Sequence, residues 1–361
     1  MKAIVLLFSA FSTAFIITSL VIPIIVQLAF AKGLVAKPNE RSSHRGIVPN
    51  LGGLGIFMGF ILSFILFSNF AEFPNMQYFL FSAILIFFIG MKDDVSAISA
   101  GTKFMGLTLA IAIPVILGNI RITSFYGIFG ITTIHPLLSI LFTIFVFLVI
   151  INAYNLIDGI NGLCGTLTSV SLCAFGLWFW FEKNPVTYQY LILITSLLGA
   201  VLGFLRFNFT PAKIFMGDTG SLMLGFITAF ITVYFIERGG NYTHPIPVRL
   251  SPVVAIGFIA IPLADMLKVF IIRIYRKRSP FQADKRHVHH LLVDLGLSHT
   301  KATLIIASGQ IFLIGIALIF QEFRAKTFAA VILIFALFVV TIPNIINHFK
   351  GKHLLKQQLN T

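Results

Sequence analysis

The chain has 361 residues, of which 58% are hydrophobic and 11% are charged, with a mean hydropathy of +0.97 and a formal net charge of +14. A soluble domain is nearer half apolar and a quarter charged, so this composition excludes an ordinary water-soluble fold. It predicts a polytopic α-helical membrane protein. The basic residues are scattered through short loops between apolar runs, which argues against nucleic-acid binding and is typical of topology signals.

Apolar runs long enough to cross a bilayer occur along the whole chain. At about 20 residues per span they number about eleven, near 3–31, 51–70, 78–91, 103–118, 136–153, 162–181, 188–205, 220–236, 251–271, 301–320 and 326–347. The first has no small-residue cleavage site before Lys32, which predicts a retained span and not a signal peptide. Residues 120–133 alternate in polarity, which predicts a small periplasmic β-hairpin. We expect a single integral membrane domain, 1–361.

The charges give this map an orientation. The side that includes Lys32 holds 18 of the 26 basic residues and the other side holds 7. The positive-inside rule makes the first side cytoplasmic, with the N-terminus outside and the C-terminus inside. All seven aspartates lie on or near that side, whereas four of the five glutamates lie outside. The shorter carboxylate suits metal and phosphate sites of fixed geometry, so we expect a cytoplasmic active site.

Two polar clusters follow apolar runs. Lys92-Asp93-Asp94 closes the third run. Adjacent carboxylates at a membrane boundary indicate either a Mg²⁺ and phosphate site or a solvated helix end. After the fifth run, Asn152, Asn155 and Asp158 are spaced to share one helix face. That spacing favours a ligand site at the cytoplasmic mouth over a plain loop.

Two further motifs carry groups that suit phosphate chemistry. In Gly217-Asp218-Thr-Gly-Ser221, a carboxylate stands beside free backbone N–H groups at a predicted helix start. This suits a metal-bound diphosphate, although a capped turn with Asp218 as N-cap would give the same pattern. The His287-Val-His289-His290 segment lacks zincin spacing and has no cysteine nearby. It favours contact with phosphates or a sugar over a structural metal or a plain surface loop.

The order of these motifs, with the Pro211-Ala-Lys-Ile-Phe-Met-Gly-Asp-Thr-Gly-Ser221 string, resembles the polyprenyl-phosphate N-acetylhexosamine-1-phosphate transferases of glycosyltransferase family 4. The resemblance runs from the Arg41-Ser-Ser-His44 loop to His290. The form of the histidine segment resembles the bacterial branch that makes undecaprenyl-diphosphate-GlcNAc. Departures from the family pattern are Ala97, Leu107 and Asn161, and the last puts fine donor preference in doubt.

The resemblance implies a bacterial plasma-membrane enzyme that transfers a sugar-1-phosphate from a UDP-N-acetylhexosamine to undecaprenyl phosphate and releases UMP. It implies Mg²⁺, or Mn²⁺, held by Asp218 and Asn155 with Asp94 near or in the shell. Asp93 would position the acceptor, Asp158 would order the metal site or sugar, and His289, His290 and Arg276 would neutralise the diphosphate. The substrate-binding residues it implies are Arg41, His44, Lys103, Asn161, Asn208, Phe215, Arg276 and His287. A homodimer would be ordinary for such a family.

The main alternative is a transporter or flippase that uses intramembrane acids for a coupling ion. Such a protein would show acids near the bilayer midplane or an internal repeat with broken helices. Asp265 is the one acid within a span, three residues before Lys268, so a local ion pair accounts for it. GlcNAc is the expected sugar, with GalNAc or a 6-deoxy N-acetyl sugar as alternatives.

Overall fold

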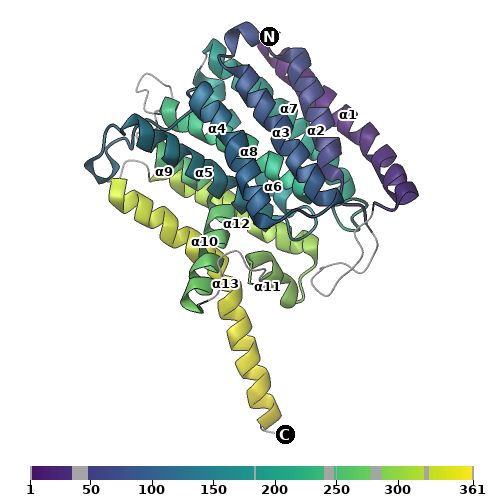
Figure 1. Ribbon diagram of the computed structural model, residues 1–361. Coiled ribbons are helices and arrows are strands. Elements are labelled where there is room, and N and C mark those ends of the chain that lie inside the picture. The colour runs from purple at the N-terminus through teal and green to yellow at the C-terminus, as the bar shows by residue number, and fades with distance from the viewer. Residues whose placement is uncertain are drawn as a thin grey trace.

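The computed structural model describes residues 2–34, 48–182, 184–239, 248, 250–277, 286–320 and 325–359, and within these ranges it is helical with no β-strand. Figure 1 shows a bundle from which the last helix projects. The elements are α1 (Lys2–Lys32), α2 (Gly52–Phe67), η1 (Phe70–Glu72), α3 (Met76–Val95), α4 (Ala100–Ala112), η2 (Ile113–Leu117), η3 (Ile128–Gly130), α5 (Pro136–Ile157), α6 (Leu163–Glu182), α7 (Pro185–Asn208), α8 (Gly217–Gly239), α9 (Ser251–Phe258), α10 (Ala260–Tyr275), α11 (Val288–Asp294), α12 (His299–Ile319) and α13 (Ala325–Leu359).

Helix α8 forms the centre of the bundle and is buried along almost its whole length. It packs against α5, α3 and α2, while α7 packs along α1, α2 and α6. Small residues allow the close approach, because a Cβ at Gly225 would lie 2.7 Å from the Cα of Ile151 on α5. Close packing of this kind is what holds helices together where lipid removes the hydrophobic driving force. The buried α8 therefore carries its first turn to a fixed place at one end of the bundle.

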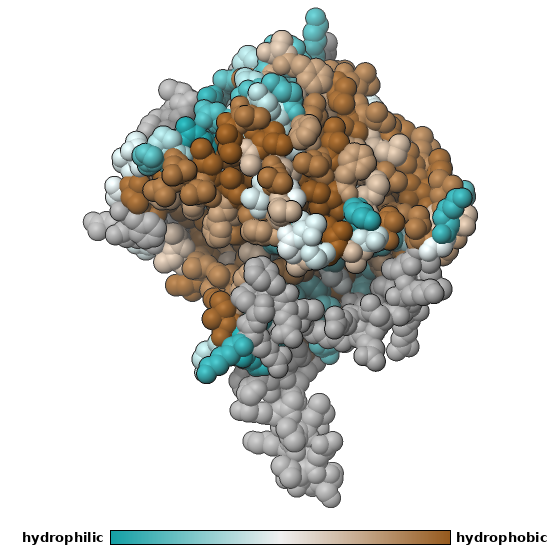
Figure 2. Space-filling model, viewed as in Figure 1, coloured by the Kyte–Doolittle hydropathy of each residue, from teal (hydrophilic) through white to brown (hydrophobic). Residues whose placement is uncertain are grey.

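The outer helices turn large apolar side chains outward, as a lipid-facing surface requires. On α1, Phe8, Leu20 and Leu28 are more than half exposed, and Figure 2 shows a broad apolar belt with hydrophilic residues toward its margins. Among the described residues, eight helices, or nine with the bent pair α9–α10, are long and apolar enough to span a membrane. The predicted eleven spans are not supported by this criterion, because α2 has only 16 residues and α3 ends in Lys92-Asp93-Asp94.

The single span predicted over 251–271 is instead two helices, α9 and α10, bent by 83°. A break of this kind frees backbone groups that lipid cannot solvate. Gln310 of α12 satisfies three of them, because its side chain accepts from the Ile261 N–H at 2.9 Å and donates to the Gly257 and Phe258 carbonyls at 3.0 and 2.9 Å. A buried glutamine one helix away thus stabilises the bend.

The predicted β-hairpin at 120–133 is wrong, because these residues form a loop with one short 3₁₀ turn, Ile128–Gly130. The donors that a ladder would need are used elsewhere. The Ile122 N–H donates to the Thr143 hydroxyl of α5 at 2.9 Å, and the Thr123 N–H donates to Glu237 of α8 at 2.9 Å. Two cross-loop backbone bonds remain, from the Ile134 N–H to the Thr123 carbonyl and from the Gly127 N–H to the Ile131 carbonyl. The alternating pattern reflects anchoring to the bundle and not strand pairing.

Candidate active site

Four helix ends meet at one end of the bundle and bring most of the predicted site residues together. Helices α3 and α5 end there, and α4 and α8 begin there. They contribute Asp93, Lys103, Asn155 and Asp218, which are joined by hydrogen bonds. We call these four residues the carboxylate mouth. Residues more than 100 positions apart in the sequence therefore form one polar site.

Asp94 points away from this group and caps α8. Its carboxylate accepts from the backbone N–H groups of Asp218 and Thr219, each at 2.8 Å, and from the Thr219 hydroxyl at 2.5 Å. The Asn50 amide adds a fourth donor at 2.9 Å. A carboxylate has about four acceptor positions, so this one is saturated by the protein. The geometry therefore favours Asp94 as the cap of α8 over Asp94 as a metal ligand. The sequence had suggested Asp218 as the N-cap, but Asp94 has that role.

Glycines make this cap possible. A Cβ at Gly90 on α3 would lie 2.6 Å from the Thr219 Cα, and a Cβ at Gly53 would lie 2.2 Å from the Gly220 nitrogen. Gly217 has a φ of +73°, and a Cβ there would lie 2.5 Å from an Asp94 carboxylate oxygen. Only a residue without a side chain suits such a position. The Gly-Asp-x-Gly-Ser string thus encodes close backbone packing as well as a carboxylate.

Lys103 is the centre of the carboxylate mouth. Its ammonium donates to Asp93 at 3.0 Å and also to Asp218. The Asp93 carboxylate additionally accepts from the Ile98 N–H at 2.9 Å, which fixes its orientation. The Asp93 and Lys103 side chains are 15% and 19% exposed and that of Asp218 is 31% exposed, so all three face solvent in part. Two carboxylates therefore share one cation at an accessible site.

Asn155 joins the mouth from α5, whereas Asn152 does not. The Asn155 amide donates to Asp218 at 2.8 Å and to the Ser221 hydroxyl at 2.9 Å. The Asn152 amide donates to the Leu148 carbonyl of its own helix at 2.7 Å. The shared face predicted from the spacing of 152, 155 and 158 therefore holds only in part. The prediction from sequence also missed Ser221 as a partner of Asn155, although Ser221 ends the motif that contains Asp218.

The donor set of the mouth suits a magnesium ion. Two carboxylates and an amide converge there, and one cation of the chain already lies between the carboxylates. Mg²⁺ is usually held by one or two carboxylates, with substrate phosphates and water in the other positions. Among the described residues no group of three or more His, Cys, Asp and Glu side chains could hold a metal alone. The mouth therefore fits a metal ion whose remaining ligands would come from a bound phosphate and from water.

His289 lies against the turn that follows α5. It is 1% exposed, and neither ring nitrogen has a hydrogen-bond partner within the described residues. A Cβ on Gly159 would lie 2.0 Å from its Nε2 atom. Burial and the neighbouring His290 hold the pKa of His289 well below its usual range, so the ring is neutral at pH 7. A neutral imidazole can donate a hydrogen bond to a diphosphate, but it does not supply the positive charge expected from sequence.

Asp158 lies between this histidine and the mouth. It ends α5 and directly precedes Gly159. Burial, followed by the charges of Asp218 and Asp94, raises the pKa of Asp158 to about 8. Its carboxyl group is therefore largely protonated at neutral pH in the ligand-free protein. That state makes it a hydrogen-bond donor at the edge of the site.

His287 is held by the protein and does not face the mouth. Its Nδ1 atom lies 2.7 Å from the Asp265 carboxylate, which also accepts from the Val288 N–H at 2.8 Å. Lys268 pairs with the same carboxylate at 3.1 Å and donates to the Val340 carbonyl. All three side chains are buried. This network fixes α11 on α10 and accounts for the one acid within a span as an ion pair, as the sequence suggested.

The loop residues assigned to substrate divide into structural and accessible ones. Asn208 is 5% exposed, and its amide is used between the Gly162 N–H at 2.7 Å and the Ile214 carbonyl at 2.9 Å. It therefore ties two loops together, and its predicted contact with substrate stays a prediction. Asn161 donates to the Thr210 hydroxyl at 3.3 Å, and Phe215 is partly exposed. Both remain at the rim of the site, where a ligand can reach them.

The basic residues predicted at the rim are less well placed. Arg276 is exposed at the end of α10. His290 follows His289 on α11 and is partly buried, with its ring 4.3 Å from that of His289. Arg41 and His44 lie outside the described residues. The carboxylate mouth and His289 are thus the parts of the site on which chemistry can be argued.

Comparison with known proteins shows the family to which the chain belongs. The family model for glycosyl transferase family 4 matches residues 76–236. The chain is 31% identical to the undecaprenyl-phosphate alpha-N-acetylglucosaminyl 1-phosphate transferase of Escherichia coli strain K12, over 90% of this chain and 87% of that protein. It is 30% identical to a probable undecaprenyl-phosphate N-acetylglucosaminyl 1-phosphate transferase of Bacillus subtilis, over 92% and 88% of the two chains. It is also 34% identical to a decaprenyl-phosphate N-acetylglucosaminephosphotransferase of Mycobacterium tuberculosis, over 81% and 77%. The chain belongs to glycosyl transferase family 4.

The family 4 match spans α3 to α8 and so contains the whole carboxylate mouth. It does not reach α11, whose histidines lie beyond residue 236. The similarity to the three relatives extends further and covers most of the chain. The residues that the family model matches therefore include the four converging helix ends of the mouth but not the histidine segment.

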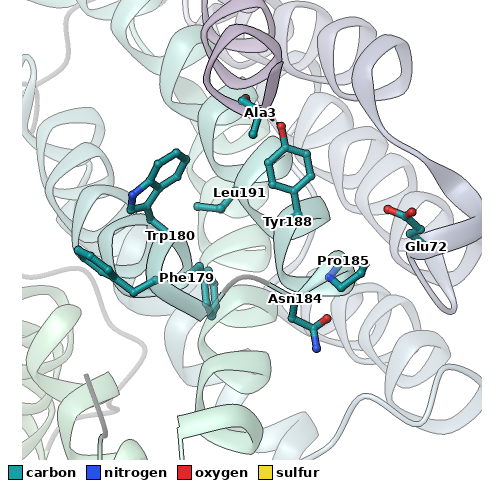
Figure 3. A pocket seen from close by; sticks show the side chains of 9 residues that line it. Ala3, Glu72, Phe179, Trp180, Asn184, Pro185, Tyr188 and Leu191 are labelled. Atoms are coloured by element: carbon teal, nitrogen blue, oxygen red, sulfur yellow. Dashed lines mark hydrogen bonds between the residues drawn. The ribbon is translucent and has the colours of Figure 1, made fainter. Parts of the chain in front are cut away.

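A cavity of about 670 Å³ lies at the other end of this family 4 bundle. Figure 3 shows Trp180, Tyr188 and Leu191 around it, with Glu72 at its far side. These residues come from the end of α6, the start of α7 and the η1 turn. None of the predicted site residues that the structure describes lines it. Aromatic side chains at such a level are typical of the membrane–water interface.

Proposed function

We propose that this chain transfers N-acetylglucosamine-1-phosphate from UDP-GlcNAc to a polyprenyl phosphate, releases UMP and so initiates a lipid-linked cell-envelope glycan. The observation that carries this proposal is the pairing of two partly exposed carboxylates with one lysine at the meeting point of four helix ends. The printed names of three relatives, each at least 30% identical over most of the chain, support the same reaction. A polyprenyl acceptor also explains why a phosphate-handling site stands at the end of apolar helices.

The reaction exchanges one phosphoanhydride bond for another. An oxygen of the polyprenyl phosphate attacks the sugar-linked phosphorus of the UDP-sugar, and the bond to the UMP phosphate breaks. The acceptor phosphate has a second pKa near 6, so little proton removal is required at pH 7. The remaining task is to bring anions together, which electrostatic groups of fixed geometry can do. A magnesium ion would supply charge neutralisation to the diphosphate.

The residues of the chain divide this task. We assign the ion to Asp218 and Asn155, with Mn²⁺ as a substitute, and the positioning of the acceptor phosphate to Asp93. Asp94 orders the first turn of α8 and thereby the place of Asp218. His289 donates a hydrogen bond to the donor diphosphate from the side of Gly159. We also assign neutralisation of the diphosphate to Arg276 and His290.

We further propose a bacterial plasma membrane location, with the mouth and the C-terminus cytoplasmic and the N-terminus outside. The uneven distribution of Lys and Arg supports this orientation. Helices α2 and α3 then also cross, since they lie beside α1, α7 and α8, and the count of spans returns to about eleven. The relatives differ in the acceptor that they are named for, undecaprenyl or decaprenyl phosphate. We propose undecaprenyl phosphate for this chain, with GlcNAc as the transferred sugar and a homodimer as the assembly.

A panel of UDP-sugars tests the proposal directly. Purified protein in detergent, supplied with undecaprenyl phosphate and Mg²⁺, should release UMP from UDP-GlcNAc and form a lipid diphosphate sugar. Release from UDP-GalNAc in preference would change the sugar but keep the reaction. Absence of UMP release from the whole panel would contradict the function. A transporter is disfavoured because Asp265, the acid within a span, is already paired with His287 and Lys268.

A further inference from the structure

The Lys103 ammonium stands at the place that the proposed metal would need. It bonds Asp93 and Asp218 together, and it comes from α4 while the two carboxylates come from α3 and α8. Both oxygens of Asp218 are engaged in this arrangement, because its Oδ1 accepts from the Asn155 amide and its Oδ2 accepts from Lys103, whose ammonium also bonds Asp93. The Asn155 amide presents its nitrogen to this carboxylate and so cannot offer its oxygen to the same ion.

We infer that Lys103 is the internal counter-ion of the metal site, and that a divalent cation binds by displacing its ammonium from Asp218. This inference rests on the proposed function. In the ligand-free state the ammonium relieves the repulsion between two partly buried carboxylates. A divalent ion in its place would supply positive charge to both carboxylates, and Asn155 would serve as a ligand through its amide oxygen once its NH2 group no longer donates to Asp218.

The exchange gives Lys103 a second partner. Once released from Asp218, its ammonium keeps Asp93 as a partner and has one donor to spare, and an anionic phosphate group is the ligand that suits this donor. Metal binding and phosphate binding are then coupled. The metal frees the Lys103 ammonium to bind the phosphate, and the phosphate gives the ammonium a partner in place of Asp218. The lysine predicted from sequence as a substrate-binding residue thus reaches substrate only after the metal has entered. The class of ligand is a divalent cation followed by a nucleotide diphosphate sugar or a phosphate monoester.

The first test measures metal affinity without turnover. Mn²⁺ binding to purified Lys103→Met protein, followed by electron paramagnetic resonance, should be about tenfold or more tighter than binding to wild type, because a charge-assisted hydrogen bond no longer competes. Lys301→Met removes one exposed lysine from the start of α12 and is the control for net charge. Its Mn²⁺ affinity should equal that of wild type. An unchanged or weaker affinity in Lys103→Met would overturn the inference and leave the lysine as a tie between helices.

The second test uses the unaltered protein, which removes any doubt about folding of the variant. The rate at which a water-soluble acetylating reagent modifies Lys103, followed by mass spectrometry, should rise severalfold when Mg²⁺ is added without substrate. Lys301 should react at the same rate with and without Mg²⁺. The Asp218→Asn protein should lose the Mg²⁺ effect on Lys103. Protection of Lys103 by Mg²⁺, or no change, would show that the ammonium stays in place.

The two proposals can fail separately. Neither readout needs a UDP-sugar or a lipid acceptor, so metal exchange at Lys103 can be observed in a protein that releases no UMP. Conversely, UMP release that depends on Mg²⁺, together with unchanged Mn²⁺ affinity in Lys103→Met, would keep the function and remove the counter-ion role.

Discussion

The charged clusters at the two ends of the bundle differ in their ratio of acidic to basic side chains. At the end away from the mouth, Glu182 of α6 pairs with Arg238 of α8, whose Nε and Nη2 atoms donate to one carboxylate oxygen at 2.9 and 2.6 Å. One acid meets one base there, and the acid side chain is only 5% exposed. At the mouth, Asp93 and Asp218 share the single ammonium of Lys103 and are more exposed. One pair is balanced in charge and its carboxylate is buried, whereas the other group has an excess of negative charge on two partly exposed carboxylates.

This difference separates a structural ion pair from a binding site within one molecule. A guanidinium–carboxylate pair in which each charged group neutralises the other needs no ligand, and it holds two helices together. Two carboxylates with one cation between them keep an affinity for further positive charge, which a divalent ion can satisfy. Helix α8 carries both arrangements, one at each end. Substitutions at the two ends should therefore affect different measurements, activity at the mouth and stability at the other end.

The largest effect is expected from Asp218→Asn. The amide has nearly the same shape but supplies no charge to a metal ion, so UMP release should fall at least about 100-fold, as when a catalytic electrostatic group is lost. The fold should persist, because Asp94 caps α8 through backbone N–H groups that the substitution keeps. Near-normal activity with an unchanged dependence on Mg²⁺ would place the metal on another residue.

Gly159→Ala tests the position of His289. The added Cβ would lie 2.0 Å from the His289 Nε2 atom, so the ring or the turn must move. A displacement of about 1 Å can reduce turnover by up to about 100-fold. Gly315→Ala on α12 is the matched control, because nothing lies within 4 Å of its Cβ. Its UMP release should be that of wild type. Full activity of Gly159→Ala would remove His289 from the site.

Much of this arrangement could be predicted from the sequence, but only as a set of motifs. Hydropathy predicted the helical membrane fold. The position of the aspartates on one side of the predicted membrane indicated that the helix ends carrying them form one site. The role of Asp94 could not be predicted, because it depends on how closely Gly90 lets α3 approach the backbone of α8. The sequence shows two adjacent acids and not which of them faces the ligand.

Two other predictions from the sequence were wrong because the structure depends on contacts that the local pattern does not show. The bend between α9 and α10 depends on Gln310, about 50 residues later, whose amide satisfies the freed backbone groups. Asn152 and Asn155 have the right spacing to share a face, but Asn152 finds a nearer acceptor on its own helix. Hydrophobic periodicity carries no information on either choice.

Asp94→Asn distinguishes capping from metal binding. If Asp94 is the cap of α8, the amide presents an N–H donor toward backbone N–H groups, and the protein should lose about 1–2 kcal/mol of stability, the scale for a lost cap. A lower midpoint of thermal unfolding in detergent would show this. The Mg²⁺ concentration that gives half-maximal UMP release should stay that of wild type. A large rise in that concentration would instead return Asp94 to the metal shell.

The smallest effect is expected at the balanced end, from Glu182→Gln. The amide oxygen can still accept from Arg238, and the amide NH2 can donate to the Thr187 hydroxyl, which lies 2.8 Å from the other carboxylate oxygen, so mainly the charge is lost. The Arg238 side chain is 35% exposed and water can solvate it, which limits the cost to about 1 kcal/mol or less. UMP release and its Mg²⁺ dependence should not change. Thermal unfolding of Glu182→Gln, Arg238→Gln and the double variant measures the coupling between the two side chains. A loss of activity without a loss of stability would mean that the far end of α8 communicates with the mouth, and the separation of the two ends would not hold.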